Sequence, residues 1–222
     1  VYKRQAITNV AMERARTHGF NELPANYLSR LARWEATFGD FEKAAERASL
    51  AMETAGNRDS IPIAAITFAL AGETEEAELL VYEMSQQFST DTIIRSVWIP
   101  LAEAVIAQQS EDHELALDLL SKGAPYERSS LIMLYVRGRS LGLLGRYDEA
   151  LAEFRKIQDL AGVDPTDPIH TLVHFGIARN HAAAGDTTAA REHYQHFFSL
   201  MADADEGLPT VGIARQEYAA LQ

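Results

Sequence analysis

Apolar residues recur at helical spacing through residues 131–160, which read LIMLYVRGRSLGLLGRYDEALAEFRKIQDL. The run is interrupted at Leu144-Gly145-Arg146, and a glycine between two periodic runs commonly ends a helix. On each side of this point the apolar positions can form one buried helix face. The stretch therefore predicts two helices that are joined by a short turn and pack against each other.

The same pattern recurs along most of the chain. Equivalent turn positions lie at Gly39, Gly72, Glu111, Gly145 and Gly185, and successive ones are 33, 39, 34 and 40 residues apart. A period near 34 residues is typical of stacked helix pairs. We therefore predict one domain over residues 1–222, with repeats at about 24–56, 58–90, 91–123, 129–162 and 168–201.

The turns divide the repeats into individual helices. A helix at Tyr2–His18 should precede the repeats, and an amphipathic helix at 209–221 should cover the apolar end of the array. Pro100 lies inside the helix predicted over Asp91–Gln109 and should kink it or restart it. The other predicted helices are Pro24–Thr37, Phe41–Thr54, Asp59–Ala71, Thr74–Phe88, His113–Lys122, Pro168–Ala184 and Thr187–Met201.

Small residues recur at one position in each helix of a pair. Two helices approach closely only where the facing side chains are small, and an aromatic side chain can then fill the space beside them. Phe154 and Tyr194 are such aromatic residues. We expect the small residues to be buried at helix–helix contacts: Ala32, Ala44, Ala65, Ala77, Ala104, Ala116, Gly138, Ala150, Ala178 and Ala190.

These features resemble the tetratricopeptide repeat (TPR), a helix–turn–helix unit of about 34 residues. The pattern L-G-x-Y-x-E-A-x-x-x-F at residues 144–154 carries the resemblance. Gly138, Gly145, Ala150 and Phe154 match the family's preferences at positions 8, 15, 20 and 24, whereas Arg137 stands where the family prefers leucine. The resemblance implies an all-α fold, a right-handed α-solenoid of antiparallel helix pairs with a C-terminal capping helix.

A longer set of segments resembles one group of TPR proteins. It is similar to the C-terminal TPR region of bacterial eukaryote-like serine/threonine protein kinases, where the repeats follow a kinase domain and usually a membrane-spanning helix. That resemblance implies a signalling protein with these repeats on the extracytoplasmic side of the inner membrane. Related repeats also follow winged-helix transcription regulators, which would place them in the cytoplasm. The segments are Ala124-Pro125-Tyr126-Glu127, Tyr135-Val136-Arg137-Gly138, Asp167-Pro168-Ile169, Ala184-Gly185-Asp186 and Ala214–Leu221.

Composition argues against several classes of function. The net charge is −12, which disfavours binding to nucleic acid or to an anionic membrane surface. With no cysteine, neither a disulfide nor a thiolate metal site can form. No apolar run is long enough to span a membrane, and no signal peptide is visible. The chain begins at Val1, apparently inside a helix, so we expect it to be part of a longer protein.

Two motifs could indicate chemistry. Gly138-Arg139-Ser140-Leu141-Gly142 matches the G-x-S-x-G nucleophile elbow, but that elbow follows a strand and these residues lie in a predicted helix. Five of the seven histidines lie between His170 and His196, at spacings that can place two ligands on one helix face. Because the chain has no H-E-x-x-H motif and no cysteine, we predict no metal site, no cofactor and no catalytic residue.

Aromatic and arginine residues recur at positions that face the inner groove in TPR proteins. Arg139 and Arg179 share position 9, and Tyr135 and Phe175 share position 5, one helical turn earlier. Two neighbouring guanidinium groups need carboxylates close by, either from the array or from an anionic peptide. The Lys and Asn residues of the family's carboxylate clamp are not matched. The predicted peptide-binding groove comprises Trp98, Leu101, Tyr135, Arg139, Phe175 and Arg179.

We therefore predict a scaffold that binds a protein or peptide. Ordinary packing between repeats is the alternative role of the six groove residues, because aromatic side chains anchor cores as well as binding sites. Self-association through the apolar ends of the array, without a groove ligand, is the alternative function. It would make the protein a homo-oligomer.

Overall fold

The chain folds into helices that belong to two compact units, residues 1–109 and 110–222. The structure, a computed structural model, describes residues 10, 12–15, 17–204 and 207–221, apart from the side chain of Ser129. These residues contain no β-strand, so the predicted all-α class is confirmed. None of the described helices has the length and apolar character needed to cross a bilayer. Most of the helix predicted at Tyr2–His18 lies outside the described residues.

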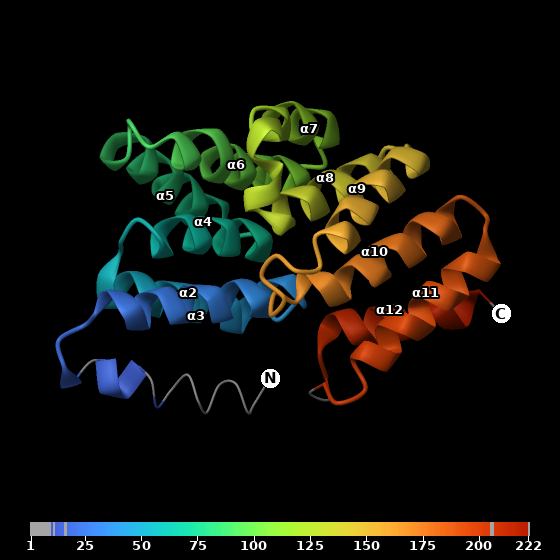
Figure 1. The fold of residues 1–222 in the computed structure, drawn as a ribbon, viewed down its shortest axis with the longest axis horizontal. Helices are drawn as coiled ribbons and strands as arrows, with labels where there is room; N and C mark the ends of the chain where they lie inside the picture. Colours follow the sequence, from blue (N-terminus) through green and yellow to red (C-terminus); the bar gives the residue numbers. More distant parts are fainter. Residues whose placement is uncertain (1–9, 11, 16, 205–206, 222) are drawn as a thin grey trace. The chain divides into compact units, whose positions relative to one another are not determined.

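The first unit contains two helix pairs followed by an interrupted helix (Figure 1). The interruption is a π-helical turn that ends two residues before Pro100. Proline lacks an N–H and disturbs the hydrogen-bond ladder of the preceding turn, so the kink predicted there takes this form. The elements are α2 (Glu22–Thr37), α3 (Phe41–Ala55), α4 (Ser60–Ala71), α5 (Thr74–Gln87), η1 (Ile94–Trp98) and α6 (Ile99–Gln109).

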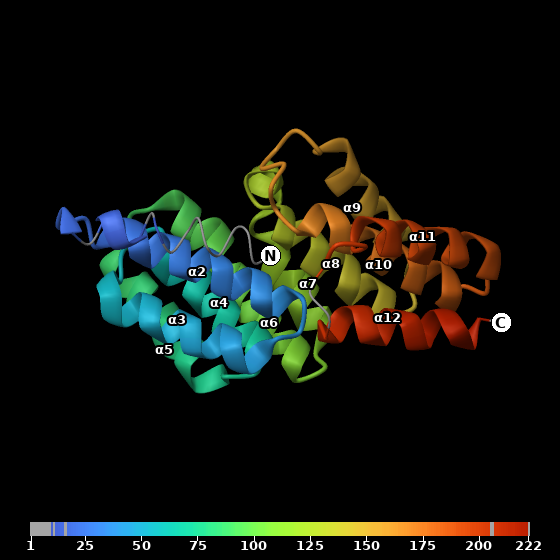
Figure 2. The ribbon, with the colours of Figure 1, turned by 90° about the horizontal axis from the view of Figure 1, so that it is seen from below.

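The second unit contains two further pairs and a final helix. In Figures 1 and 2 this final helix, α12, runs beside α11, which is the place expected of a cap. A short 3₁₀ helix at residues 124–129 was not predicted, because its proline suggested a chain break. The elements are α7 (His113–Ser121), η2 (Ala124–Ser129), α8 (Leu131–Leu143), α9 (Tyr147–Asp159), α10 (Ile169–Ala183), α11 (Thr187–Leu200) and α12 (Pro209–Ala220).

Helix pairs form where the repeats predict them. Within the first unit α2 packs on α3 and α4 on α5, and within the second unit α8 packs on α9 and α10 on α11. The pairs also stack, since α4 contacts α2 and α10 contacts α8 and α9. The predicted repeat 91–123 is divided between the units, because α6 closes the first and α7 opens the second. The described fold is thus a TPR-like array of stacked antiparallel helix pairs in each unit.

All five predicted turns adopt the left-handed backbone conformation between consecutive helices. The φ angle lies between 75° and 87° at Gly39, Gly72, Gly145 and Gly185, where glycine meets no Cβ penalty. Glu111 occupies the equivalent place with φ of 59°, although a side chain there costs about 1–2 kcal/mol. Repeat spacing therefore predicts this turn correctly without a glycine.

The predicted small residues are all buried. Phe154 shows why one of them, Gly138, and a further residue, Gly176, need to be glycine. A Cβ at Gly138 would lie 2.6 Å from Cε1 of the Phe154 ring, and a Cβ at Gly176 would lie 2.8 Å from its Cζ. Gly138 belongs to the same repeat as Phe154, whereas Gly176 belongs to the next one. The ring therefore fills a space that is opened by two successive repeats.

Arg137, the departure from the family pattern, is held by a network of charges. Its Nη1 lies 3.1 Å from Oε2 of Glu127 in η2 and 3.2 Å from Oε2 of Glu153 in α9. Lys156 bridges the same two carboxylates at 3.2 and 3.0 Å. Glu153 is buried, and a buried carboxylate is tolerated only when it is paired in this way. The arginine thus joins three elements where the family pattern packs leucine.

Candidate peptide-binding site

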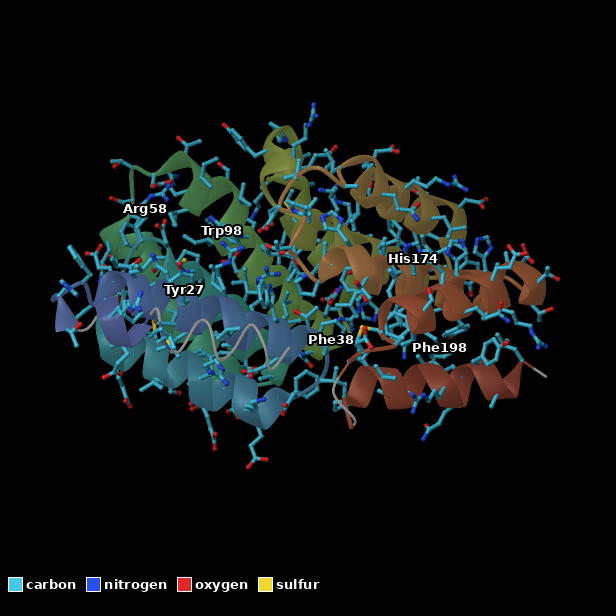
Figure 3. All side chains as sticks on the ribbon, turned by 60° about the horizontal axis from the view of Figure 1, so that its bottom comes forward. Tyr27, Phe38, Arg58, Trp98, His174 and Phe198 are labelled. Carbon is cyan, nitrogen blue, oxygen red and sulfur yellow. The ribbon has the colours of Figure 1, made fainter. Side chains whose placement is uncertain are left out.

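The six predicted groove residues are distributed over both units. Trp98 and Leu101 lie in the first unit, and the other four lie in the second. Leu101 is completely buried inside α6, so its side chain packs within the array and offers no surface to a ligand. Trp98 ends the π turn and is partly exposed (Figure 3). The second unit therefore contains more of the predicted groove residues than the first.

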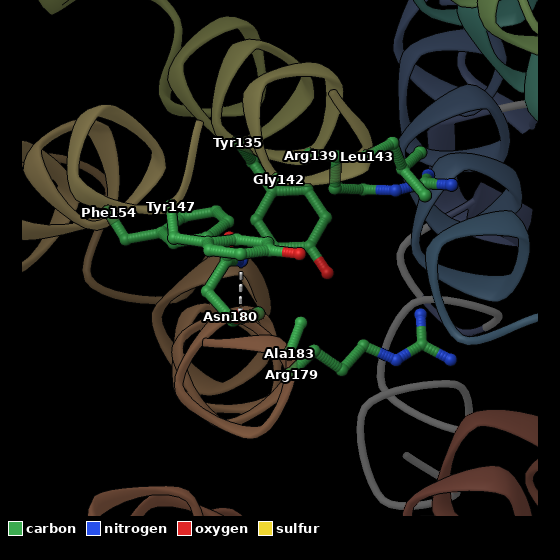
Figure 4. Close-up of a pocket in the computed structure, with 10 residues that line it drawn as sticks. Tyr135, Arg139, Gly142, Leu143, Tyr147, Phe154, Arg179, Asn180 and Ala183 are labelled. Carbon is green, nitrogen blue, oxygen red and sulfur yellow. Dashed lines mark hydrogen bonds between the residues drawn. The ribbon is translucent and has the colours of Figure 1, made fainter. Parts of the chain in front are cut away.

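A cavity of about 170 Å³ lies in the second unit, between residues of α8, α9 and α10. Three predicted residues, Tyr135, Arg139 and Arg179, line it, and the two arginine side chains extend toward the same side (Figure 4). Phe175 does not line the cavity, because its ring is buried beneath Arg179. The remaining lining residues are Gly142, Leu143, Tyr147, Phe154, Gly176, Asn180 and Ala183.

The walls of the cavity are formed where small residues allow α8 and α10 to approach each other. Gly142 faces Asn180, and a Cβ on this glycine would lie 2.5 Å from Oδ1 of the carboxamide. Phe154 closes the base of the cavity against Gly176, as described above. Tyr147 opens α9 directly after the turn at Gly145. The glycines and the turn of the repeats thus place aromatic and amide groups around one small cavity.

Asn180 supplies an acceptor without a partner. Its Nδ2 donates to the carbonyl of Gly176 at 2.9 Å, which fixes the orientation of the carboxamide. Its Oδ1 is buried and accepts no hydrogen bond from the described protein groups. A buried acceptor left unsatisfied costs about 1–3 kcal/mol, so a donor that enters the cavity would be favoured.

Arg179 already holds a carboxylate. Its guanidinium lies over the Phe175 ring, with Cζ 4.2 Å from the ring centroid. Glu217 of α12 accepts hydrogen bonds from Nε at 2.9 Å and from Nη2 at 2.5 Å, and Tyr194 donates to the same carboxylate at 2.7 Å. Burial lowers the pKa of Arg179, but the hydrogen bonds to Glu217 outweigh it and the pKa is raised. The carboxylate that neutralises Arg179 therefore comes from the protein itself and not from a bound peptide.

Arg139 differs from Arg179 in having no such partner. It is partly exposed, and no carboxylate of the described residues forms an ion pair with it. Burial raises the pKa of the nearby Tyr135 hydroxyl, while the charges of Arg139 and Arg179 lower it, and the net change is upward. Tyr135 is therefore protonated at neutral pH and can donate a hydrogen bond. The cavity offers a cation and a hydroxyl donor beside the unpaired amide acceptor.

The predicted groove left out the other lining residues, among them Gly142, Tyr147 and Asn180, and it left out Glu217, which pairs with Arg179. Asn180 immediately follows Arg179, and an amide among apolar residues on a predicted core helix is a signal that could have been used. Tyr147 belongs to the quoted repeat pattern, and that pattern gave it no role in a site. Glu217 lies 38 residues after Arg179, and nothing in the local sequence links the two.

The structure also shows where the G-x-S-x-G match and the histidine-rich segment lie. Ser140 is buried in the middle of α8, in a helix with no strand before it. The histidines of α10 and α11 lie close together, but within the described chain no three His, Asp or Glu side chains are arranged to hold a metal ion.

Comparison with protein-family models and with curated proteins found no match. Among solved structures, a mutant of MamA, a TPR-like helical repeat protein, is 21% identical over 84% of this chain and 97% of its own, with a TM-score of 0.44. A second structure, MamA AMB-1, is 20% identical over 85% of this chain and 98% of its own, with a TM-score of 0.42. Identity and superposition at this level carry nothing about ligands, so the assignment to a TPR-like fold rests on the helix pairs, turns and small residues described above.

Proposed function

We propose that this chain is a protein-interaction module that binds an acidic peptide segment at the cavity between α8 and α10. Arg139 is the residue that receives the carboxylate. One observation carries the proposal: Arg179, at the same repeat position, holds the carboxylate of Glu217, whereas Arg139 has no described carboxylate partner.

The two arginines share a sequence context as well as their repeat position. Each follows an aromatic residue by four positions, Tyr135 before Arg139 and Phe175 before Arg179. An arginine stacked on a ring keeps its N–H groups in a fixed plane that suits bidentate binding of a carboxylate. The Arg179–Glu217 contact is such an arrangement within this protein. It supports a carboxylate as the group that Arg139 takes from a partner.

The apolar part of the ligand would enter the cavity itself. Leu143 lines it with 60% of its surface exposed, beside the buried rings of Tyr135 and Phe154. A cavity of about 150 Å³ is known to accept a molecule as large as benzene, so the volume here suits one leucine-sized side chain. A backbone N–H of the same peptide would satisfy Oδ1 of Asn180. The ligand class is therefore an extended peptide with an acidic end preceded by an apolar residue.

Fluorescence anisotropy with labelled peptides tests this assignment. The peptide should end in two acidic residues preceded by leucine, and the reference peptide should carry the corresponding amides and an amidated end. Arg139→Ala should weaken binding of the acidic peptide at least tenfold, because a charge-assisted hydrogen bond contributes about 1.5–3 kcal/mol. Binding should also weaken as salt is raised.

Arg155→Ala is the matched control. Arg155 is exposed on α9 and does not line the cavity, so its removal changes the net charge equally but leaves the site intact. Equal binding by the Arg139→Ala and Arg155→Ala proteins would exclude Arg139 as the carboxylate site. Circular dichroism of both variants should match the wild type, because neither side chain is in the core.

Self-association is a second candidate, favoured by an exposed apolar pair on α5. Leu79 and Tyr82 lie one turn apart and are 68% and 66% exposed. Light scattering over a dilution series distinguishes the two functions, since only self-association predicts a mass that falls with concentration. Leu79→Ser together with Tyr82→Ser should then give a constant monomeric mass.

The parent protein is part of the same proposal. The quoted segments resemble the TPR region that follows a bacterial serine/threonine kinase domain, and this resemblance alone supports a signalling parent. On that view the module would report ligand binding to a kinase elsewhere in the polypeptide. Sequencing the open reading frame around these 222 residues tests it. A winged-helix domain upstream would instead favour a transcription regulator.

A further inference from the structure

Four histidines gather between α10 and α11, away from the cavity described above. His174 and His181 come from α10, and His193 and His196 come from α11. Nδ1 of His174 lies 3.5 Å from Nδ1 of His193, and its ring centroid lies 4.1 Å from that of His196. The ring of His181 stacks on that of His193 at 5.7 Å. Figure 3 labels His174 on the ribbon.

Carboxylates near the cluster are few and stand at its edge. Asp186, in the turn that joins the two helices, lies 3.6 Å from His181. Glu192 is the acidic residue that acts on His193. Within the described chain, the charged groups that act on His174 and His193 all come from α10 and α11, and none comes from α8, α9 or α12. The centre of the cluster therefore lacks a counter-charge.

The cluster favours neutral rings. Burial, followed by the neighbouring His196 and His193, lowers the pKa of His174 to about 4. Burial and the neighbouring His181 and His196 also lower the pKa of His193. Protonation of one ring in the folded protein is opposed by desolvation and, once a second ring is charged, by repulsion. In the unfolded chain these rings are solvated and separate.

We propose that the histidine cluster is an acid-sensitive clasp, which holds α10 and α11 together near neutral pH and releases them as the pH falls toward about 5. The inference does not depend on the ligand proposed above. Release would nevertheless reach the binding site, because α10 supplies Arg179 and Asn180 to the cavity. It would also free α12, whose Glu217 is held by Arg179 of α10 and Tyr194 of α11.

The direction follows from proton binding. Well above pH 6.5 the rings of His174 and His193 are neutral in both states, and the clasp contributes its full stability. Between pH 6.5 and about 4 the unfolded chain binds protons that folded His174 does not, so the free energy of unfolding falls as the pH falls. At pH 5 the cluster should raise the unfolding equilibrium constant by on the order of tenfold.

Thermal unfolding at pH 7.5 and pH 5.0 in the presence of EDTA tests the clasp. The wild type should lose about 5 °C more in Tm between these pH values than a variant that combines His174→Gln, His193→Gln and His196→Gln. His170→Gln is the matched control, since His170 is on α10 but bonds to the carbonyl of Val163 outside the cluster. This control should lose as much as the wild type. An equal loss in the triple variant would overturn the proposal.

Nuclear magnetic resonance titration of the wild type gives a result that does not depend on a variant that folds. The imidazole C–H signals of His174 and His193 should titrate below the usual histidine pKa of about 6.5. Amide protection in α10 and α11 should fall over the same pH range, ahead of that in α8 and α9. Ordinary titration of both rings near pH 6.5, with unchanged protection, would overturn the proposal equally.

Discussion

The α8–α9 and α10–α11 pairs have the same kind of contact between their two helices, here called the joint. They differ in the elements that cover this contact. Both have a left-handed glycine turn, a small residue on each helix and an aromatic residue in the second helix. Phe154 fills this last position in the first pair and is fully enclosed by its own and the next repeat. Tyr194 fills it in the second pair, where α12 is the next described element and the tyrosine hydroxyl donates to Glu217 of that helix.

Position 9 shows the consequence of this difference. In the last pair α12 approaches closely enough to neutralise Arg179, whereas in the preceding pair Arg139 lies beside a cavity with no described carboxylate partner. The residues that form the joint are of nearly the same type in both pairs, and both pairs have the same helix–turn–helix fold. What varies is the element that covers each pair, and this determines which arginine is available to a partner.

Removal of the Phe154 ring should have the largest effect on the shared joint. Phe154→Ala leaves a void between two repeats and should lower the free energy of unfolding of the second unit by about 3–5 kcal/mol. Urea unfolding followed by circular dichroism measures it. Tyr82→Ala is a suitable control, because this exposed ring on α5 should change stability by less than about 0.5 kcal/mol. A loss under 1 kcal/mol for Phe154→Ala would show that the ring contributes little packing energy, because it already borders the cavity.

Enlargement of the small positions should test both pairs alike. Ala150 and Ala190 are fully buried, and Ala150→Leu or Ala190→Leu should each cost about 1–3 kcal/mol by overpacking. Differential scanning calorimetry of the two variants should show similar losses. Ala152→Leu, at an exposed position on α9, should leave the Tm unchanged within error. If one pair tolerates leucine, the joints are not equivalent.

Removal of the cap carboxylate should have the smallest effect on stability. Glu217→Gln takes the charge from a pair whose side chains are 45% and 33% exposed, so it should cost about 1 kcal/mol or less. It would also convert Arg179 into an unpaired arginine like Arg139. The acidic peptide should therefore bind the variant as tightly as the wild type or more tightly. Weaker binding would mean that Glu217 itself belongs to the ligand site.

Local signals were sufficient to predict most of the fold. The turn at Glu111 could be placed because equivalent turns recur along the chain. Ala150 and Ala190 could be assigned to helix contacts because each contact lies within one helix pair. The π turn could be predicted only as an irregularity at Pro100, since proline can be accommodated in several ways.

The candidate site was less accessible from the sequence. Arg139 and Tyr135 could be identified from their equivalence between repeats, but Leu101 shares that register and is buried. Repeat position specifies a direction around the helix, not the depth to which neighbouring elements cover it. The partner of Arg179 could not be found, because Glu217 belongs to a cap that lies outside the repeat pattern.

The ring of Phe154 packs against both Gly138 and Gly176, so one side chain contacts two helix pairs. In a linear array, the free energy of such a shared contact is a coupling between neighbours, and it is lost when either pair opens. If α10 moves away, the α8–α9 pair loses the packing on one side of its largest fully buried side chain. Opening of the α10–α11 pair should therefore lower the stability of the α8–α9 pair as well, one repeat away.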